Sequence, residues 1–325
     1  MKICVIGGAG YIGSHAVYEL IRDGHEVVVI DNLSTGNKEM IHGDARFHLG
    51  DITNKKELTN IFKIECAEKK FDVVMHFAAK IVVPESVEFP LEYYYNNVEG
   101  VRIMLEVMRD FNIKNIIFSS TAAVYGEPVN EVCYEDDLTI PVNPYGESKL
   151  ASEKMIKWVC ERYNMNYCIF RYFNVAGADK SLEIGLKSDM LTHLIPIAIQ
   201  TALGIRTEMS VYGTDYDTKD GSCIRDYIHV SDLAKAHVMG AKYIYGNNES
   251  LLINLGSNSG FSVLEVVQEI EKIKPVNKRM DLRREGDPAI LIASNQRAKE
   301  ILGWKPELNL EDIIKTDMGF REKRK

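Results

Sequence analysis

The sequence lacks the features that mark several classes of protein. Its 325 residues contain no uninterrupted apolar run of transmembrane length. There is no excess of basic residues to neutralise nucleic-acid phosphates, because 39 Lys and Arg stand against 47 Asp and Glu and the formal net charge is -8. No internal repeat or low-complexity tract is present. We therefore expect a globular cytoplasmic protein with no membrane or nucleic-acid partner.

Cysteine patterning is missing as well. The six cysteines are scattered, with neither a C-x-x-C pair nor the Cys/His spacing of a metal site, so we expect reduced thiols and no metal. The remaining composition, with 46% hydrophobic and 26% charged residues, is that of an ordinary globular chain. Its length suffices for one large domain or two joined ones.

Short apolar runs alternate with helical patterns through the first half of the chain. Ile3–Ile6 predicts a strand, Tyr11–Asp23 a helix and Val27–Ile30 the next strand. The alternation continues with predicted helices over Asn54–Lys69, Pro90–Phe111 and Tyr145–Tyr163, and with strands over Asp72–His76, Asn115–Ser119 and Tyr167–Arg171. This order predicts an α/β fold with a doubly wound parallel sheet of the Rossmann type.

The rhythm becomes irregular after Asn174. A helix is expected from Met190 to Leu203, and the strand Ile228–Val230 followed by a helix over Ser231–Tyr245 indicates a return to the first layer. We therefore assign residues 1–174 to a first domain, to which 226–250 return, and residues 175–325 to a smaller α/β lobe.

Three glycines, Gly7, Gly10 and Gly13, follow the first strand and open the first helix. Glycine permits a tight turn and lets backbone N–H groups approach a pyrophosphate at the positive end of a helix. Asp31 ends the second strand, 18 residues after Gly13, where its carboxylate can bind the adenosine ribose and repel a ribose phosphate. This arrangement predicts NAD rather than NADP. Asp51, with Ile52 after the next strand, can hold the adenine, although Asp51 equally suits a helix cap.

A second candidate site lies at the start of the helix predicted from Tyr145. Pro144 suits the first helical position, and Tyr145 and Lys149, four residues apart, share one face. A neighbouring ammonium favours the phenolate, so Tyr145 is a candidate general base tuned by Lys149. By itself such a pair also fits two unrelated surface side chains, so its meaning depends on a cofactor site that points at it.

These motifs occur together, and the combination resembles the extended short-chain dehydrogenase/reductase family. The segments that carry the resemblance, besides the glycine loop and the Tyr145/Lys149 pair, are His76–Ala79, Asn96–Val98 and Ser119–Gly126. Within that family, UDP-glucose 4-epimerases are the members that the chain resembles over essentially its whole length, on the strength of Arg171–Asn174, Arg225–Val230 and Arg283–Asp287.

The resemblance implies an isomerase of galactose metabolism. Its reaction would be the reversible, NAD-dependent C4 epimerisation of UDP-galactose and UDP-glucose through a 4-keto sugar, with Tyr145 as the base. It also implies an NAD-binding domain at 1–174, a nucleotide-sugar-binding lobe at 175–325, and a homodimer formed through the helices near 90–111 and 145–163.

The site residues follow from the same resemblance. Thr121 joins Tyr145 and Lys149 as catalytic, since its hydroxyl can bind the 4-oxygen of the sugar and help to pass the proton. The implied cofactor contacts are Gly7, Gly10, Tyr11, Ile12, Gly13, Asp31, Asn32, Asp51, Ile52, Phe77, Ala78, Ala79, Asn96, Ser119, Tyr145, Lys149 and Tyr172. The implied substrate contacts are Thr121, Tyr145, Asn174, His193, Leu194, Tyr212, Arg225, Arg284, Asp287 and Leu291.

Several positions bear on alternatives. Related 4,6-dehydratases place an acid after the threonine, whereas Thr121 is followed by Ala122, which favours epimerisation without elimination. Ile81 stands where the family usually has a lysine, with Lys80 one residue earlier. Leu291, on the pocket wall, is intermediate in size, which leaves open a 4-epimerase of UDP-N-acetylhexosamine or another nucleotide sugar. A non-catalytic NAD-sensing protein is a further alternative, against which the retained Tyr145 counts.

Overall fold

The computed structural model of the chain describes residues 1–187, 191–284 and 288–324. These residues form two compact units. The first unit comprises Met1–Gly126, Thr139–Arg171 and Ala234–Ile253, and the second comprises Glu127–Leu138, Tyr172–Leu233 and Asn254–Lys325. Each unit has a hydrophobic core of its own.

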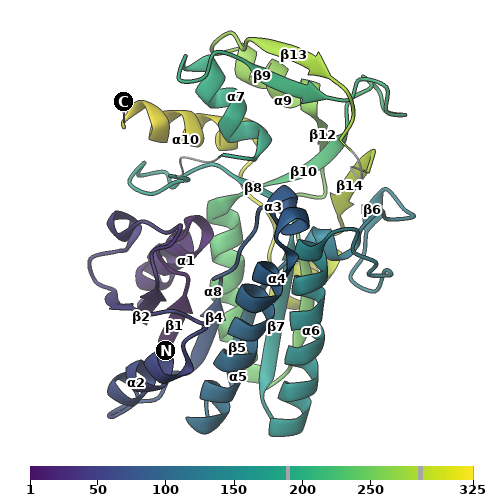
Figure 1. The fold of residues 1–325 in the computed structure, drawn as a ribbon. Helices are drawn as coiled ribbons and strands as arrows, with labels where there is room; N and C mark the ends of the chain where they lie inside the picture. The colour runs from purple at the N-terminus through teal and green to yellow at the C-terminus, as the bar shows by residue number, and fades with distance from the viewer. Residues whose placement is uncertain (188–190, 285–287, 325) are drawn as a thin grey trace. The chain divides into compact units, whose positions relative to one another are not determined.

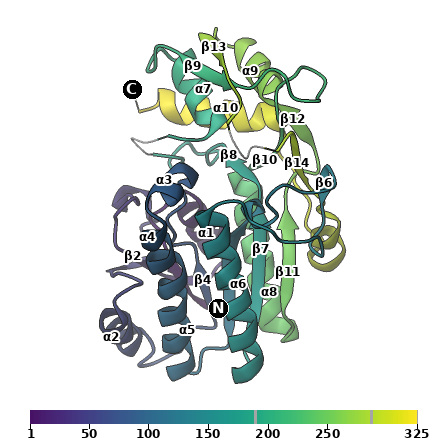
Figure 2. The same cartoon turned by 45° about the vertical axis from the view of Figure 1, so that its right-hand side comes forward.

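The first unit is built around a seven-stranded sheet in the order β11-β7-β5-β4-β1-β2-β3 (Figure 1). Pairing is parallel between β1 and β2, β1 and β4, β2 and β3, and β4 and β5. The strands are β1 (Lys2–Ile6), β2 (Glu26–Asp31), β3 (Arg46–Leu49), β4 (Val73–His76), β5 (Asn115–Thr121), β7 (Asn166–Tyr172) and β11 (Leu251–Leu255). Figure 2 shows β7 and β11 side by side. The predicted doubly wound α/β fold is confirmed.

The strand order places a ligand-binding edge between β1 and β4. From β1 the sheet grows through β2 and β3 on one side and through β4, β5 and β7 on the other. In open α/β sheets, ligands bind at the carboxyl ends of the strands where the order reverses in this way. Gly7 follows β1 and Phe77 follows β4, and the N–H of Phe77 donates to the carbonyl of Ile6 at 2.8 Å.

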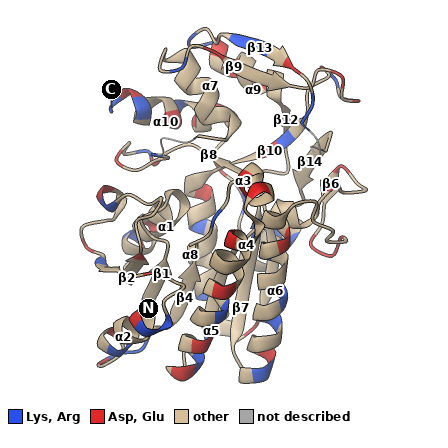
Figure 3. Ribbon diagram, in the orientation of Figure 1, with Lys and Arg blue, Asp and Glu red and all other residues tan. Residues whose placement is uncertain are grey.

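Helices cover the sheet and bury its apolar strands. They are α1 (Tyr11–Arg22), α2 (Lys55–Glu65), α3 (Val83–Glu88), α4 (Pro90–Tyr93), α5 (Gly100–Asp110), α6 (Pro144–Tyr163) and α8 (Val230–Asn247). All five residues of β1 are buried, as expected for a parallel strand covered on both faces. The colours in Figure 3 show basic and acidic residues interspersed along the ribbons of α5 and α6, which fits helices with one apolar and one polar face.

The single helix predicted over Pro90–Phe111 is interrupted. Between α4 and α5 the chain forms a π-helical segment, Tyr94–Glu99. Such wide turns are rare and often occur at functional sites. The segment contains Asn97, which is buried and bonds neighbouring elements, a role that helical periodicity does not encode.

The second unit contains two small sheets and three α-helices in its described residues. Strand β10 (Ile224–His229) pairs with β8 (Asn174–Ala176) and β14 (Ile290–Ala293) in parallel and with β12 (Gly260–Ser262) in antiparallel orientation, and β14 pairs with β6 (Val132–Cys133). Strands β9 (Met209–Tyr212) and β13 (Lys278–Asp281) pair separately. The helices are α7 (Leu194–Ala202), α9 (Val263–Glu271) and α10 (Leu310–Glu322). Of the helix predicted from Met190 to Leu203, Met190 lies outside the described residues.

The described residues contain neither a candidate membrane span nor a candidate metal cluster. None of their helices is both long and apolar enough to cross a membrane. Nor do three His, Cys, Asp or Glu side chains in this part of the chain come together in a way that could hold a metal ion.

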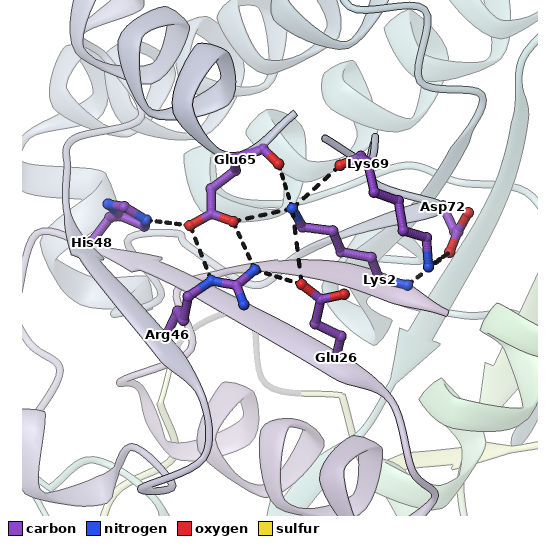
Figure 4. A network of polar contacts seen from close by, with 7 residues as sticks. All are labelled: Lys2, Glu26, Arg46, His48, Glu65, Lys69 and Asp72. Carbon is purple, nitrogen blue, oxygen red and sulfur yellow. Dashed lines mark hydrogen bonds and ion pairs between the residues drawn. The ribbon is translucent and has the colours of Figure 1, made fainter. Parts of the chain in front are cut away.

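Polar side chains form a network at the amino ends of the first three strands (Figure 4). Glu65, at the end of α2, has a buried side chain and accepts hydrogen bonds from Arg46 at 2.8 and 3.2 Å and forms an ion pair with Lys2 at 3.2 Å. His48 lies 2.7 Å from the same carboxylate. Burial alone would raise the pKa of Glu65, but the hydrogen bonds from Arg46, His48 and Lys2 outweigh it and lower the pKa to about 2.

We expect Glu65→Gln to destabilise the protein in a pH-dependent way. Because the folded pKa lies below the unfolded value of 4.5, the stabilisation is present above pH 4.5 and is lost as the pH falls towards 2. At pH 7 the variant should lose about 2 kcal/mol of unfolding free energy, a figure that allows for the solvent-screened Arg46. Urea unfolding at pH 7 and pH 3.5 measures the change, with Glu68→Gln as an exposed control. An equal loss for Glu65→Gln at both pH values would contradict the prediction.

Candidate active site

The helix that begins after Asn143 presents the predicted Tyr145/Lys149 pair. The Asn143 side chain caps α6 by accepting a hydrogen bond from the N–H of Gly146 at 2.9 Å, and Pro144 occupies the first turn. The four-residue spacing then puts Tyr145 and Lys149 on one face, which is turned towards the carboxyl end of β5.

Tyr145 is hydrogen-bonded to Thr121, the last residue of β5. Its ring also forms a nearly perpendicular pair with the ring of Tyr93, with the ring centroids 6.5 Å apart. Burial raises the pKa of Tyr145 to about 12, and the hydrogen bond with Thr121 opposes that rise. The structure thus brings together the two side chains predicted to handle the proton.

Lys149 contacts β5 at Ser119, two residues before Thr121. Its ammonium donates to the carbonyl of Ser119 at 2.7 Å and lies 4.7 Å from the centre of the Phe118 ring. Burial lowers the pKa of Lys149 to about 7, and the Glu153 carboxylate opposes that fall. The Thr121 side chain thus lowers the pKa of Tyr145, and the effect of Lys149 on Tyr145 stays a prediction.

The glycine loop has the geometry of a cradle in front of α1. Gly7 has a φ of +81°, and a Cβ on Gly13 would lie 2.1 Å from the Gly7 carbonyl oxygen, so the turn itself requires glycine at both positions. Gly10 differs, because its backbone is extended and a Cβ there would meet only the Gly7 oxygen, at 3.3 Å. Among the described residues no side chain caps the start of α1, so this helix end fits a pyrophosphate.

Asp31 is buried at the end of β2, beside the glycine loop. Its carboxylate accepts hydrogen bonds from the N–H groups of Ala9 at 2.9 Å and Leu33 at 2.8 Å. These bonds aim the carboxylate while leaving acceptor capacity, since each oxygen can accept more than one bond. The residues present therefore fit the adenosine end of a dinucleotide.

Asp51, the second predicted acidic contact, is hydrogen-bonded to the residue that follows Asp31. Asn32 donates to the Asp51 carboxylate at 2.9 Å, and Asp51 also accepts from the N–H and hydroxyl of Thr53. Asp51 does not cap the following helix. The N-cap of α2 is Asn54, whose side chain accepts a hydrogen bond from the N–H of Glu57. Ile52, next to Asp51, is buried.

The loop after β4 contains Phe77, Ala78 and Ala79 and is tied down by Asn97. The Asn97 side chain accepts from the N–H of Lys80 at 2.8 Å and donates to the Lys80 carbonyl and to the Ser148 hydroxyl, both at 3.0 Å. It thereby connects this loop to α6. The predicted cofactor contact is the adjacent Asn96, whose amide donates to the Asn97 side chain at 2.9 Å. In the sequence, the only indication of the role of Asn97 is that it stands next to Asn96.

Lys80 is engaged at the surface. Its ammonium bonds Glu92 at 2.7 Å and Glu85 at 3.3 Å, and Ile81 beside it is exposed. Because both carboxylates come from α3 and α4, Lys80 is occupied with these helices in this structure. Of the other predicted cofactor contacts, Tyr11, Ile12 and Gly13 start α1, and Ser119 and Tyr172 lie at the carboxyl ends of β5 and β7.

The second unit brings most of its predicted substrate contacts together in two groups. In the first group, Arg225 of β10 lies directly beside Leu291 of β14, and Asn174 of β8 pairs with Tyr227 of β10. A small pocket is lined by Asn174, His193, Leu194 and Tyr227, among others. Three neighbouring strands and the start of α7 thus supply this group.

The second group consists of Tyr212 and Arg284. Tyr212 ends β9, and the Arg284 guanidinium lies 3.9 Å from the centre of its ring, a cation–π distance. The adjacent Arg283 is different, because it forms an ion pair with Asp215 at 2.6 Å. The two neighbouring arginines therefore have different partners, a difference that the sequence alone does not show. The predicted contact Asp287 lies outside the described residues.

The chain is similar over nearly its whole length to proteins of known family and structure. The model of the GDP-mannose 4,6 dehydratase family matches residues 4–317. The UDP-glucose 4-epimerase of Lacticaseibacillus casei is 46% identical over 325 residues, which cover 99% of this chain and 97% of that protein. A crystal structure of a UDP-glucose 4-epimerase has a TM-score of 0.96 at 46% identity, covering 100% of this chain and 98% of the other.

A further solved structure carries ligands. The UDP-glucose 4-epimerase of Bifidobacterium longum in complex with NAD+ and UDP has a TM-score of 0.93 at 36% identity and covers 99% of this chain and 98% of its own.

Proposed function

The chain belongs to the UDP-glucose 4-epimerase family, within the extended short-chain dehydrogenases/reductases, and we infer that it is an isomerase that inverts C4 of UDP-galactose and UDP-glucose. NAD is its cofactor, as in the related Bifidobacterium longum structure. The observation that supports the chemistry best is the contact of Tyr145 with Thr121, next to the bond from Lys149 to Ser119.

The glycine loop, Asp31 and the loop after β4 would hold NAD. When bound, NAD supplies the group that accepts a hydride from C4 and gives it back. Asp31, the open cradle at Gly10 and the uncapped start of α1 fit the ribose and the pyrophosphate. Most of the other predicted cofactor contacts lie at the carboxyl ends of strands or in the loops and helix starts that follow them, whereas Asn96 lies in the π-helical segment Tyr94–Glu99.

Tyr145 acts as the base in this proposal. It takes the proton of the 4-hydroxyl, directly or through Thr121, and loss of this proton together with the hydride on C4 gives a 4-keto sugar. It must return the same proton when the other epimer forms. Since burial raises the pKa of Tyr145 to about 12, its deprotonation relies on the Thr121 hydroxyl and on the positive charge of Lys149 nearby.

In this proposal the lobe of residues 175–325 binds the nucleotide part of the substrate. Residues 1–174, together with the returning segment 226–250, form the NAD-binding domain. Arg225 and Arg284 suit the diphosphate because a guanidinium is permanently charged and binds phosphate through paired hydrogen bonds. Because the substrate is held by its UDP part, the 4-keto ring is free to rotate and to present its opposite face to the cofactor. Tyr212, already stacked with Arg284, provides an aromatic surface for the uracil.

We propose further that the protein is a cytoplasmic homodimer. The helices named for the interface expose large apolar side chains: Leu91 on α4 is 82% exposed, Tyr95 in the π-helical segment 60% and Trp158 on α6 72%. Exposed apolar groups of this size on adjoining helices suit a symmetric contact between two copies. The net charge of -8 speaks against a nucleic-acid partner.

The proposed function is tested by incubating the purified protein with UDP-galactose, first without and then with added NAD. Separation of the nucleotide sugars should show UDP-glucose, at a constant ratio to UDP-galactose once equilibrium is reached. Absence of UDP-glucose at every NAD concentration would refute the assignment. UDP-N-acetylgalactosamine and other nucleotide sugars in parallel incubations decide whether Leu291 admits a broader range of substrates.

A further inference from the structure

Glu153 is a buried carboxylate that continues the stripe of Tyr145 and Lys149. It lies four residues after Lys149 on α6, and its side chain is 1% exposed. A charged group so completely buried is costly unless it is paired and hydrogen-bonded. Its partners therefore show what it holds in place.

Those partners come from the two strands next to α6. The Ser120 hydroxyl of β5 donates to the Glu153 carboxylate, and Arg171 of β7 donates to it twice, at 3.0 and 2.7 Å. Arg171 in turn donates to the hydroxyl of Tyr125 at 3.1 Å. The carboxylate thus joins α6 to β5 and β7.

The position of Ser120 gives this link its significance. Ser120 stands between Ser119, whose carbonyl receives Lys149, and Thr121, which bonds Tyr145. Three consecutive residues of β5 therefore meet three residues of α6 that are spaced by one helical turn. A shift of β5 along α6 would misplace both catalytic contacts together, and the Ser120–Glu153 hydrogen bond opposes such a shift.

The charges around Lys149 point to the same residue. On β4, His76 has its pKa lowered to about 3, mainly by burial and further by Lys149, so it faces the ammonium as a neutral ring. From β5 come the Ser119 carbonyl and the Phe118 ring, and from α6 come Tyr145 and Glu153. Arg171 of β7 is positive but paired with Glu153. The Glu153 carboxylate is the charge that raises the pKa of Lys149 against the effect of burial.

We propose that Glu153 is a positioning residue for the Tyr145–Lys149 pair, which keeps β5 in register with α6 and supplies the negative charge that supports the Lys149 ammonium. The proposal rests on the proposed function for its catalytic meaning, while its electrostatic part concerns Lys149 alone. Glu153 acts through other residues and has no contact of its own with the reacting atoms in this proposal.

The first test is Glu153→Gln in the NAD-bound enzyme. Without the carboxylate, the charged form of Lys149 is less favourable, so the alkaline limb of the kcat profile should move to lower pH by about one unit. The 15N NMR titration of the Lys149 ammonium, assigned by its loss in Lys149→Met, should move in the same direction by a similar amount. This titration does not depend on turnover, so it separates failure of the proposal from failure of the proposed function.

A matched control and a second variant complete the test. Glu65→Gln removes another buried, arginine-paired carboxylate of the same unit, at the opposite edge of the sheet, and should leave the Lys149 titration unchanged. Ser120→Ala keeps the charge and removes the bond to β5, so we expect kcat to fall about tenfold while KM stays within twofold. An unshifted Lys149 titration in folded Glu153→Gln, or an unchanged kcat in Ser120→Ala, would overturn the proposal.

Discussion

Replacing Tyr145 by phenylalanine should lower kcat for UDP-galactose about 10³-fold and leave KM within a few-fold. The reason is that general acid–base catalysis by one positioned group is worth roughly 10²–10⁴ in rate. Phenylalanine keeps the ring and its edge-on contact with Tyr93 but loses the hydroxyl that bonds Thr121. A fall in kcat without a comparable change in KM is typical of an interaction used mainly in the transition state. Initial rates of UDP-glucose formation give both constants.

The same helix offers a control for the Tyr145 prediction. Tyr163, the last residue of α6, is partly exposed, and Tyr163→Phe removes a hydroxyl at the opposite end of the helix. It should retain kcat within twofold. If Tyr145→Phe kept more than a tenth of the kcat of the unchanged protein, Tyr145 would not be the base, and a group elsewhere would have to take the proton.

Replacing Gly10 by alanine should weaken NAD binding about 10²-fold, which corresponds to about 2.7 kcal/mol. The backbone of Gly10 has a φ of -76°, which alanine adopts without strain, and the added Cβ would touch only the Gly7 oxygen. The methyl group would instead fill the space where the pyrophosphate approaches the start of α1. We therefore expect a folded protein with a melting temperature close to that of the unchanged chain but little retained NAD. Calorimetric titration with NAD measures the affinity.

Two other glycines make the Gly10 result interpretable. Gly43→Ala, where a Cβ would meet nothing within 4 Å, should change neither stability nor NAD affinity. Gly13→Ala should lower stability as well as affinity, because its Cβ would collide with the Gly7 carbonyl. Undiminished NAD affinity in folded Gly10→Ala would show that the glycine loop serves the turn alone.

Local patterns predicted the order of the elements well. The strands after Lys2, Glu26 and Asn115 carry continuous apolar runs, and the helix at Tyr145 has both a capping asparagine and a first-turn proline. Such signals depend on a few neighbouring residues and can be read directly. The π-helical turn at Tyr94–Glu99 was missed because the apolar spacing on either side of it is compatible with one continuous helix.

Within the candidate site, the sequence predicted the shared face of Tyr145 and Lys149 but not the contacts that these side chains make. The spacing placed Tyr145 and Lys149 on one face, and the structure has them there, with Thr121 at the end of the adjoining strand. The assignment of individual residues to catalysis, cofactor and substrate stays a prediction. Glu153 lay within reach of the same reasoning, since it repeats the four-residue spacing, but its partners Ser120 and Arg171 lie on two other elements.

The sequence by itself determined the α/β alternation, the glycine turn, the acidic residue after the second strand and the shared face of Tyr145 and Lys149. Each of these is set by backbone conformation and side-chain period over a few residues. Only the tertiary structure decided which group sets the proton affinity of which other group. Thr121 lowers the pKa of Tyr145, and Glu153 raises the pKa of Lys149. The physical reason is that pKa values depend on burial and on charges within a few ångströms, and these are brought together from strands and helices far apart in the chain.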